Sequence, residues 1–345
     1  MATPNENVRD AFLLKKPECV PAGICLGGSW PFFMEGTPLR DLLDDPLRAA
    51  TIFYRANERV DADFVTVGTG ATAFMIEGLG GEIAFSGNGA PTILSPLVAQ
   101  KEDISSLDIQ AALRSPKVQW LKEVASQTIQ LNKSHRSIFV SGRAPFTLAG
   151  QLLGLETLSK SIYKDKALVE KILDFTTELA VAYYEFMLEV SGIDGIFIAD
   201  PSGSGDVVSA RHFQTYVVPY LTKVVKRLAG YQKLSLVHIC GNITDRLHLL
   251  VQTGIQMVSV DSKVDLERAA EILGGKIGLA GNVNPVTTIE QKSKDDVYRE
   301  STSCLNAVAQ KGGFMLLPGC DLSAKASEEN VKALTKAAHN WRYQT

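Results

Sequence analysis

From about residue 137 onward, the chain alternates short apolar runs with longer amphipathic segments. The runs have the length of β-strands, and the segments between them carry apolar residues at helical spacing. Buried parallel strands read as continuous apolar runs because helices cover the sheet. The pattern therefore predicts repeated strand and helix units around a parallel sheet. The six expected strands occupy residues 137–142, 195–200, 233–240, 256–261, 276–281 and 313–320.

Two further apolar runs, at 20–27 and 63–70, bring the expected strands to the eight that a closed barrel requires. Barrels of this type commonly reach about 250 residues and accept insertions. We therefore expect residues 1–345 to form a single α/β domain, a (β/α)8 TIM barrel with an N-terminal extension. Residues 81–94, GEIAFSGNGAPTIL, indicate an inserted hairpin or long loop.

Capping residues indicate where two of the expected helices begin. Ser209 is expected to cap a helix that ends at Gly230, and Ser327 to cap the last helix, which has Glu328 and Glu329 in its first turn.

Composition narrows the class of protein. Apolar residues make up 45% and charged residues 21% of the chain, enough for a sizeable core. The net charge is −3, and no run of Lys and Arg suggests a nucleic-acid partner. The polar start and the lack of an apolar stretch of about 18 residues favour a cytoplasmic protein without a membrane role. The five cysteines do not form a dense disulfide framework, so we expect reduced thiols.

Active sites of such barrels lie at the carboxyl ends of the strands. The side chains at these ends are unusually rich in chemistry, and they comprise Arg143, Asp200, His238 with Cys240, Asp261, Asn282 with Asn284, and Cys320 with Asp321.

His238 and Cys240 are two residues apart, so a strand places both on one face. Cys320 ends the last expected strand in the sequence LPGCDL. One imidazole and two thiolates match a catalytic zinc site that keeps a fourth position open. The competing interpretation is ordinary core cysteine and a histidine that satisfies a carbonyl. Cys19, Cys25 and Cys304 receive that structural interpretation.

The remaining strand-end residues have two interpretations each. Arg143 is a candidate anchor for a substrate anion, or a structural partner of Asp200. Asp200 is a candidate catalytic residue, and Asp261 is a candidate substrate contact. Both could orient His238, because carboxylates often orient metal-bound imidazoles. The alternative for each is a salt bridge at the rim of the barrel or a helix cap. Asn282 and Asn284 in GNVNP are turn formers first and substrate contacts second.

At these positions the sequence resembles the uroporphyrinogen decarboxylase superfamily, and within it the zinc-dependent methylcobamide:coenzyme M methyltransferases. The resemblance rests on HICGN (238–242), on 258–285, on LLPGCDLSAKASEENVKAL (316–334) and on GRAPFTLAG (142–150). It implies that His238, Cys240 and Cys320 are the metal ligands. It also implies a corrinoid, free or protein-bound, as the methyl-carrying co-substrate, and a small thiol such as coenzyme M as the partner. Superfamily members also form homodimers, so a homodimer is compatible with it.

Decarboxylation of a porphyrinogen is disfavoured, because members with that activity carry an arginine-rich motif near the N-terminus, whereas residues 20–33 here contain no arginine. The first hundred residues match the methyltransferases poorly, which leaves the substrate open.

Three functions remain in competition. In the leading hypothesis, a zinc-activated thiol accepts a methyl group from a methylcorrinoid. In the second, transfer runs the other way, and zinc polarises a small methylated ether, thioether or amine that donates its methyl to a corrinoid. In the third, the barrel is non-catalytic, its zinc is structural or absent, and its surface docks a partner. A fourth protein ligand would support this hypothesis, and His248 is the candidate.

Overall fold

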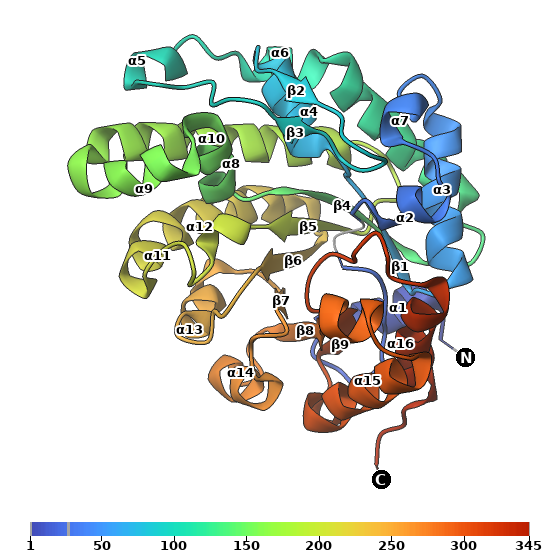
Figure 1. Ribbon diagram of the computed structural model, residues 1–345. Coiled ribbons are helices and arrows are strands. Elements are labelled where there is room, and N and C mark those ends of the chain that lie inside the picture. The colour runs from blue at the N-terminus through green and yellow to red at the C-terminus, as the bar shows by residue number, and fades with distance from the viewer. Residues whose placement is uncertain (1, 26–27, 345) are drawn as a thin grey trace.

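The computed structural model describes residues 2–25 and 28–344. Its centre is a curled sheet of seven parallel strands, and Figure 1 shows helices around the outside of this sheet. The order β1-β4-β5-β6-β7-β8-β9 follows the chain, as the alternating pattern predicted. The strands are β1 (Phe64–Val67), β4 (Ser137–Arg143), β5 (Gly195–Ala199), β6 (Leu234–Ile239), β7 (Met257–Val260), β8 (Gly278–Val283) and β9 (Phe314–Pro318).

Residues 20–25 occupy the place of the eighth strand, between β9 and β1. Ala22 forms a parallel bridge with Leu316 of β9, and its carbonyl accepts a hydrogen bond from the backbone N–H of Asp63 at 2.8 Å. The segment is not a regular strand because Pro21 lacks an N–H and the N–H of Ala22 bonds to the Asp63 side chain, also at 2.8 Å. The expected strand 20–27 is thus reduced to one bridge, and its residues 26 and 27 lie outside the described residues. The predicted TIM-barrel fold is confirmed.

Helices lie before, between and after the strands, and most of them cover the outer face of the sheet. They are α1 (Pro4–Phe12), α2 (Trp30–Met34), α3 (Pro46–Arg59), α4 (Ala71–Gly78), α5 (Lys101–Ile104), α6 (Ile109–Arg114), α7 (Pro116–Leu131), α8 (Pro145–Leu153), α9 (Leu155–Lys164), α10 (Lys166–Leu188), α11 (Ala210–Tyr216), α12 (Val218–Leu228), α13 (Leu247–Leu250), α14 (Leu266–Leu273), α15 (Lys294–Val308) and α16 (Glu328–Asn340).

The helix expected from Ser209 to Gly230 is divided in two. Ser209 caps α11 as predicted, but α11 ends at Tyr216 and α12 begins at Val218. The physical reason is Pro219, which has no N–H to donate and whose ring crowds the carbonyl four residues earlier. Ser327 caps α16 as expected, by accepting from the N–H of Asn330.

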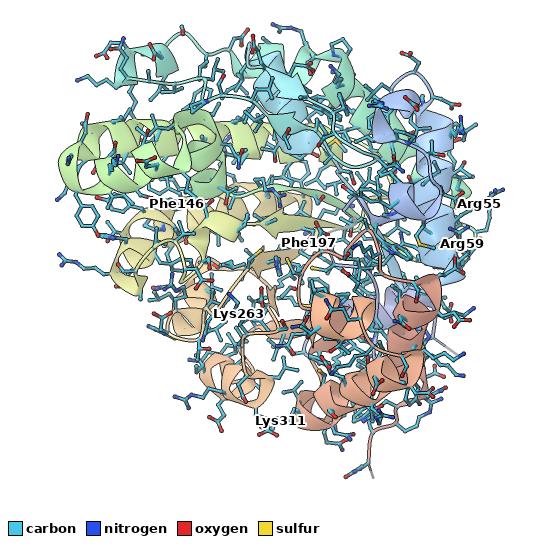
Figure 2. The ribbon with its side chains drawn as sticks, viewed as in Figure 1. Arg55, Arg59, Phe146, Phe197, Lys263 and Lys311 are labelled. Atoms are coloured by element: carbon cyan, nitrogen blue, oxygen red, sulfur yellow. The ribbon has the colours of Figure 1, made fainter. Side chains whose placement is uncertain are left out.

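Buried apolar residues form two layers, one outside the sheet and one inside the barrel. The outer layer packs the helices against the barrel wall, and the inner layer fills the barrel. Phe12 of α1 stacks on Phe139 of β4 in the inner layer, so the N-terminal extension packs against the barrel core. In Figure 2, Phe197 of this layer lies near the centre of the molecule, whereas Arg55 and Arg59 of α3 lie at its periphery.

The inserted segment is a short antiparallel hairpin, which is the first of the two forms expected from the sequence. Its strands β2 (Ile83–Ala84) and β3 (Thr92–Ile93) lie beside α4 in Figure 1. The backbone N–H of Ala90 donates to the Ser29 hydroxyl at 3.0 Å, which ties the hairpin to the segment before α2. None of the helices in the described ranges combines the length and apolar character needed to span a bilayer.

Candidate metal centre

Three potential metal ligands meet at the carboxyl ends of β6 and β9. His238 lies within β6, and Cys240 follows its end by one residue, so both side chains leave the same face. Cys320 comes two residues after the end of β9. Strands β7 and β8 separate β6 from β9, and the curvature of the barrel brings their ends together.

The separations of the three ligand atoms fit a tetrahedral zinc ion. The Cys240 and Cys320 sulfurs are 3.6 Å apart, and the Cys240 sulfur is 3.4 Å from His238 Nε2. All three ligand atoms lie within 4.8 Å of one another. Ideal Zn–S and Zn–N bonds at tetrahedral angles would place two sulfurs about 3.8 Å apart and a sulfur about 3.6 Å from a nitrogen. The two distances that involve the Cys240 sulfur therefore differ from these ideal values by only a few tenths of an ångström.

The two thiols have unequal acidity. The hydrogen-bond contact between the Cys240 and Cys320 sulfurs raises the pKa of Cys240 and lowers that of Cys320; the neighbouring imidazole of His238 lowers the pKa of Cys320 further. Two thiolates this close repel each other unless a cation lies between them. The donor set thus favours a divalent cation.

The cluster is partly open. His238 is fully buried, whereas Cys240 and Cys320 keep some exposed surface. Among the described residues, no fourth metal-binding side chain joins the three. His248, suggested as a fourth ligand for a structural site, is exposed on α13 outside the cluster.

The imidazole of His238 is oriented by a serine, where the sequence suggested a carboxylate. His238 Nδ1 lies 3.0 Å from the hydroxyl of Ser259. Ser259 is the register partner of His238 in the pairing of β6 with β7, which explains the contact. This pairing cannot be derived from sequence spacing alone, although Ser259 lies two residues before Asp261 and therefore on the same face of its strand.

Asp261 holds the backbone beside the cluster. Its carboxylate accepts from the N–H of Gly241 at 2.9 Å, directly after Cys240, and from the N–H of Lys263 at 3.0 Å. Its part in the site is thus to fix the loop that carries Cys240.

Asp200 is fully buried at the end of β5. One of its carboxylate oxygens accepts from the Thr147 hydroxyl at 2.6 Å, and the other has no hydrogen-bond partner among the described residues. Burial raises the pKa of Asp200 to about 6, against the lowering effects of Thr147 and Arg143. The backbone N–H of Asp200 donates to the His238 carbonyl at 2.8 Å, so its link to the ligand passes through the main chain.

Asn282 is turned into the barrel wall. Its amide donates to the carbonyls of Asp261 at 3.0 Å and Val264 at 2.7 Å, and its oxygen faces the Cys304 thiol of α15 at 3.8 Å. Both amide hydrogens are thus bonded to the main chain, and the substrate contact of Asn282 stays a prediction. Asn284 caps the following turn by accepting from two backbone N–H groups, as a turn former should.

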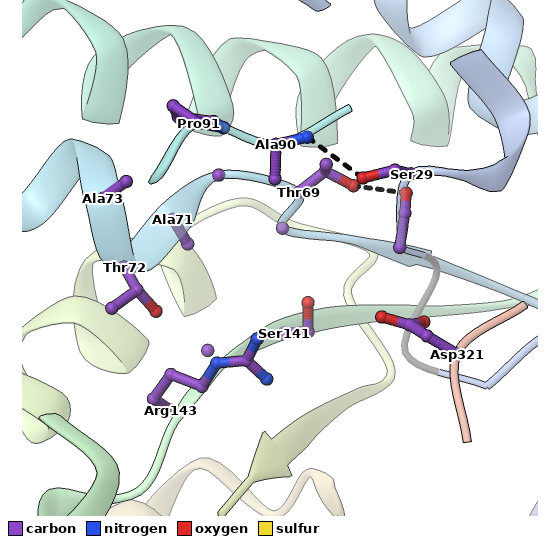
Figure 3. A pocket seen from close by; sticks show the side chains of 14 residues that line it. Ser29, Thr69, Ala71, Thr72, Ala73, Ala90, Pro91, Ser141, Arg143 and Asp321 are labelled. Atoms are coloured by element: carbon purple, nitrogen blue, oxygen red, sulfur yellow. Dashed lines mark hydrogen bonds between the residues drawn. The ribbon is translucent and has the colours of Figure 1, made fainter. Parts of the chain in front are cut away.

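A pocket of about 580 Å³ of empty space, its opening to solvent included, lies at the same carboxyl end of the barrel (Figure 3). Arg143 and Ser141 of β4 line it together with the start of α4 and Asp321, the residue after Cys320. The Arg143 guanidinium forms no hydrogen bond or close ion pair with the residues that the structure describes, so the alternative of a structural pair with Asp200 is not realised as a direct contact.

Asp321 lies across the pocket from Arg143 in Figure 3. Its side chain is open to the pocket but deep within the surrounding protein. That desolvation and the nearby Cys320 sulfur raise its pKa to about 6, while Arg143 and His238 act in the opposite direction.

Two kinds of enzyme are similar to this chain in sequence. A methylcobamide:CoM methyltransferase of Methanosarcina acetivorans is 27% identical over 73% of this chain and 72% of its own length. A uroporphyrinogen decarboxylase of Paraburkholderia phytofirmans is 25% identical over 92% of this chain and 84% of its own length. Five methyltransferases that we compared are matched over 50% to 72% of their lengths.

A solved structure described as a methyltransferase from Methanosarcina mazei superposes with a TM-score of 0.86, over 98% of both chains at 23% identity, which establishes the shared fold. The sequence model of uroporphyrinogen decarboxylase (URO-D) matches residues 3–341. This chain therefore belongs to the uroporphyrinogen decarboxylase (URO-D) family.

Proposed function

We propose that this protein is a zinc-dependent methyltransferase that transfers a methyl group from a methylcorrinoid to a small thiol. The observation that carries the proposal is the spacing of His238 Nε2 and the sulfurs of Cys240 and Cys320, all within 4.8 Å. Similarity to enzymes named methylcobamide:CoM methyltransferases supports the reaction class.

The donor set suits activation of a thiol. Two thiolate ligands, from Cys240 and Cys320, cancel the charge of a divalent ion, and neutral His238 completes three protein ligands. When bound, zinc supplies a fourth position at which a substrate thiol is held as its thiolate. The formal charge of such a site is −1, which keeps the substrate sulfur electron-rich and nucleophilic toward a methyl group. The exposed sulfur surface of the two cysteines leaves this position reachable.

The pocket beside Cys320 provides a second hold on the substrate. Arg143 places a permanent positive charge there, and the Ser141 residue is 8% exposed with a hydroxyl that has no partner in the described part of the chain. The first turn of α4 faces the same space, and its N–H groups favour negative charge. We infer that the far end of the thiol is a sulfonate or carboxylate held by these groups.

Transfer in the opposite direction, from a small methylated donor to a corrinoid, would use the same metal ligands. The experiment below distinguishes the two directions. A non-catalytic, structural zinc is less well supported, because its fourth protein ligand is missing from the described residues.

The test combines metal analysis with a methyl-transfer assay. Zinc content is measured in the purified protein, and loss of methylcobalamin absorbance is followed on addition of 2-mercaptoethanesulfonate. Cys320→Ala should lose both zinc and activity. Cys19→Ala is the matched control, because Cys19 is also half-buried but lies outside the cluster.

About one zinc per chain, with thiol-dependent demethylation that only Cys320→Ala abolishes, is the expected result. If the protein binds zinc and shows no thiol-dependent activity, but methylates cobalt(I) from a methylated donor, the methyl transfer runs in the opposite direction. A protein that binds no zinc would refute the proposal.

A further inference from the structure

A buried hydroxyl supports His238 from behind. Ser259 and His238 are both fully buried, and their side chains meet at 3.0 Å between neighbouring strands β7 and β6. No other polar side chain in the described part of the chain is hydrogen-bonded to Nδ1. The contact therefore decides how the ring is held.

Metal binding through Nε2 would set the direction of this hydrogen bond. Nε2 faces the Cys240 sulfur at 3.4 Å, so it is the nitrogen turned toward the ligand cluster. A neutral imidazole that offers Nε2 to a metal carries its hydrogen on Nδ1. Nδ1 must then donate to the Ser259 oxygen, and the Ser259 hydrogen must point elsewhere.

Cys25 provides the place for that hydrogen. Its sulfur lies 4.0 Å from the Ser259 oxygen, and the residue is fully buried in the inner core of the barrel. Cys25 belongs to the segment 20–25 that closes the barrel between β9 and β1. The contacts His238–Ser259–Cys25 thus run through a buried region from β6 to the closing segment.

We propose that Ser259 is a positioning residue that fixes the tautomer and the ring orientation of His238 for metal binding, with Cys25 holding the Ser259 hydroxyl in place. The inference rests on the proposed metal centre. Partners of this kind raise metal affinity because they orient the ligand before the ion arrives.

A serine suits this centre better than the carboxylate that often supports a metal-bound histidine. Cys240 and Cys320 already supply two negative charges, enough to cancel a divalent ion. A buried carboxylate behind His238 would add a third charge and its desolvation cost. The neutral hydroxyl of Ser259 orients the ring without changing the charge of the site.

The test measures metal affinity and ligand geometry separately from activity. Ser259→Ala removes the hydroxyl with little change in volume, and Ser259→Thr restores one. Ser137→Ala is the matched control, because Ser137 is equally buried in a barrel strand and its hydroxyl has no partner among the described residues. Zinc affinity is measured by competition with a chromophoric chelator, and the cobalt(II)-substituted proteins are compared by visible absorption.

We expect Ser259→Ala to weaken zinc binding by about 10- to 100-fold and to change the cobalt(II) spectrum. Ser259→Thr should recover most of the affinity, and Ser137→Ala should match the wild type. Cys25→Ala should weaken binding by only a few-fold, and it serves as the second variant if Ser259→Ala does not fold.

Unchanged affinity and spectrum in Ser259→Ala and Cys25→Ala, with normal zinc binding by the wild type, would overturn this inference alone. Equal losses in Ser259→Ala and Ser137→Ala would also overturn it, because they would indicate general destabilisation. A wild type that binds no zinc would overturn the proposed metal centre together with it.

Discussion

Replacing Asp63 by alanine should weaken the closure of the barrel. The Asp63 carboxylate accepts two hydrogen bonds of 2.8 Å, one from the N–H of Ala22 in the closing segment and one from His339 Nε2 of α16. Asp63 is 6% exposed and Ala22 is fully buried. One side chain therefore joins the closing segment, β1 and the last helix.

The expected loss follows from these two contacts. Without the carboxylate, the buried N–H of Ala22 loses its acceptor, which costs about 1–3 kcal/mol. The His339 pair is partly exposed and should contribute about 1 kcal/mol. We expect Asp63→Ala to lower the free energy of unfolding by about 3 kcal/mol at pH 6.

Part of this loss should depend on pH. Burial alone would lower the pKa of His339, but the hydrogen bond and charge of Asp63, together with the charge of Asp61, raise it above its ordinary value. A raised folded-state pKa stabilises the protein fully below the unfolded value of about 6.5, and this stabilisation is lost as pH rises through the folded-state pKa. The penalty of Asp63→Ala should therefore be larger at pH 6 than at pH 9.

Equilibrium urea unfolding, followed by circular dichroism and tryptophan fluorescence at both pH values, measures these differences. Asp61→Asn is the control, because Asp61 is 66% exposed and lies farther from His339, at 3.4 Å. It should cost less than about 0.5 kcal/mol. A penalty below about 1 kcal/mol for Asp63→Ala, or one that does not shrink between pH 6 and 9, would refute the reasoning.

Three further outcomes test the site. Arg143→Gln should raise the KM for an anionic thiol about 10-fold or more while leaving that for an uncharged thiol within about 2-fold, and equal effects on both thiols would argue against an anion anchor. Asn282→Ala should lower the free energy of unfolding by about 1–3 kcal/mol without raising KM, because the buried Val264 carbonyl loses its amide donor. A raised KM with normal stability would support the predicted substrate contact. Removal of zinc with a chelator should lower the melting temperature, because a ligand that binds only the folded state stabilises it. Added zinc should restore the melting temperature of the wild type but not that of Cys320→Ala. Identical melting curves with and without metal would contradict this prediction.

The barrel and the cluster of His238, Cys240 and Cys320 were accessible from sequence pattern. Continuous apolar runs identify parallel strands, and a spacing of two residues places His238 and Cys240 on one face whatever their neighbours do. Cys320 could be added because strand ends of a barrel converge at its mouth. The hairpin at 83–93 followed from local turn chemistry.

Other features depended on contacts between distant segments. The replacement of a carboxylate by Ser259 behind His238 follows from the register of β6 with β7, and local sequence does not encode register. Asn282 faces the barrel wall because α15 and the loop after β7 offer it partners there.

The closing segment shows the same division. Its apolar character was evident in the sequence, but Pro21 and the side chain of Asp63 reduce the expected strand to one bridge with Leu316. Patterns of apolar residues reflect burial, which each segment encodes locally, whereas the partners of polar groups are set by geometry that forms only when the whole barrel closes.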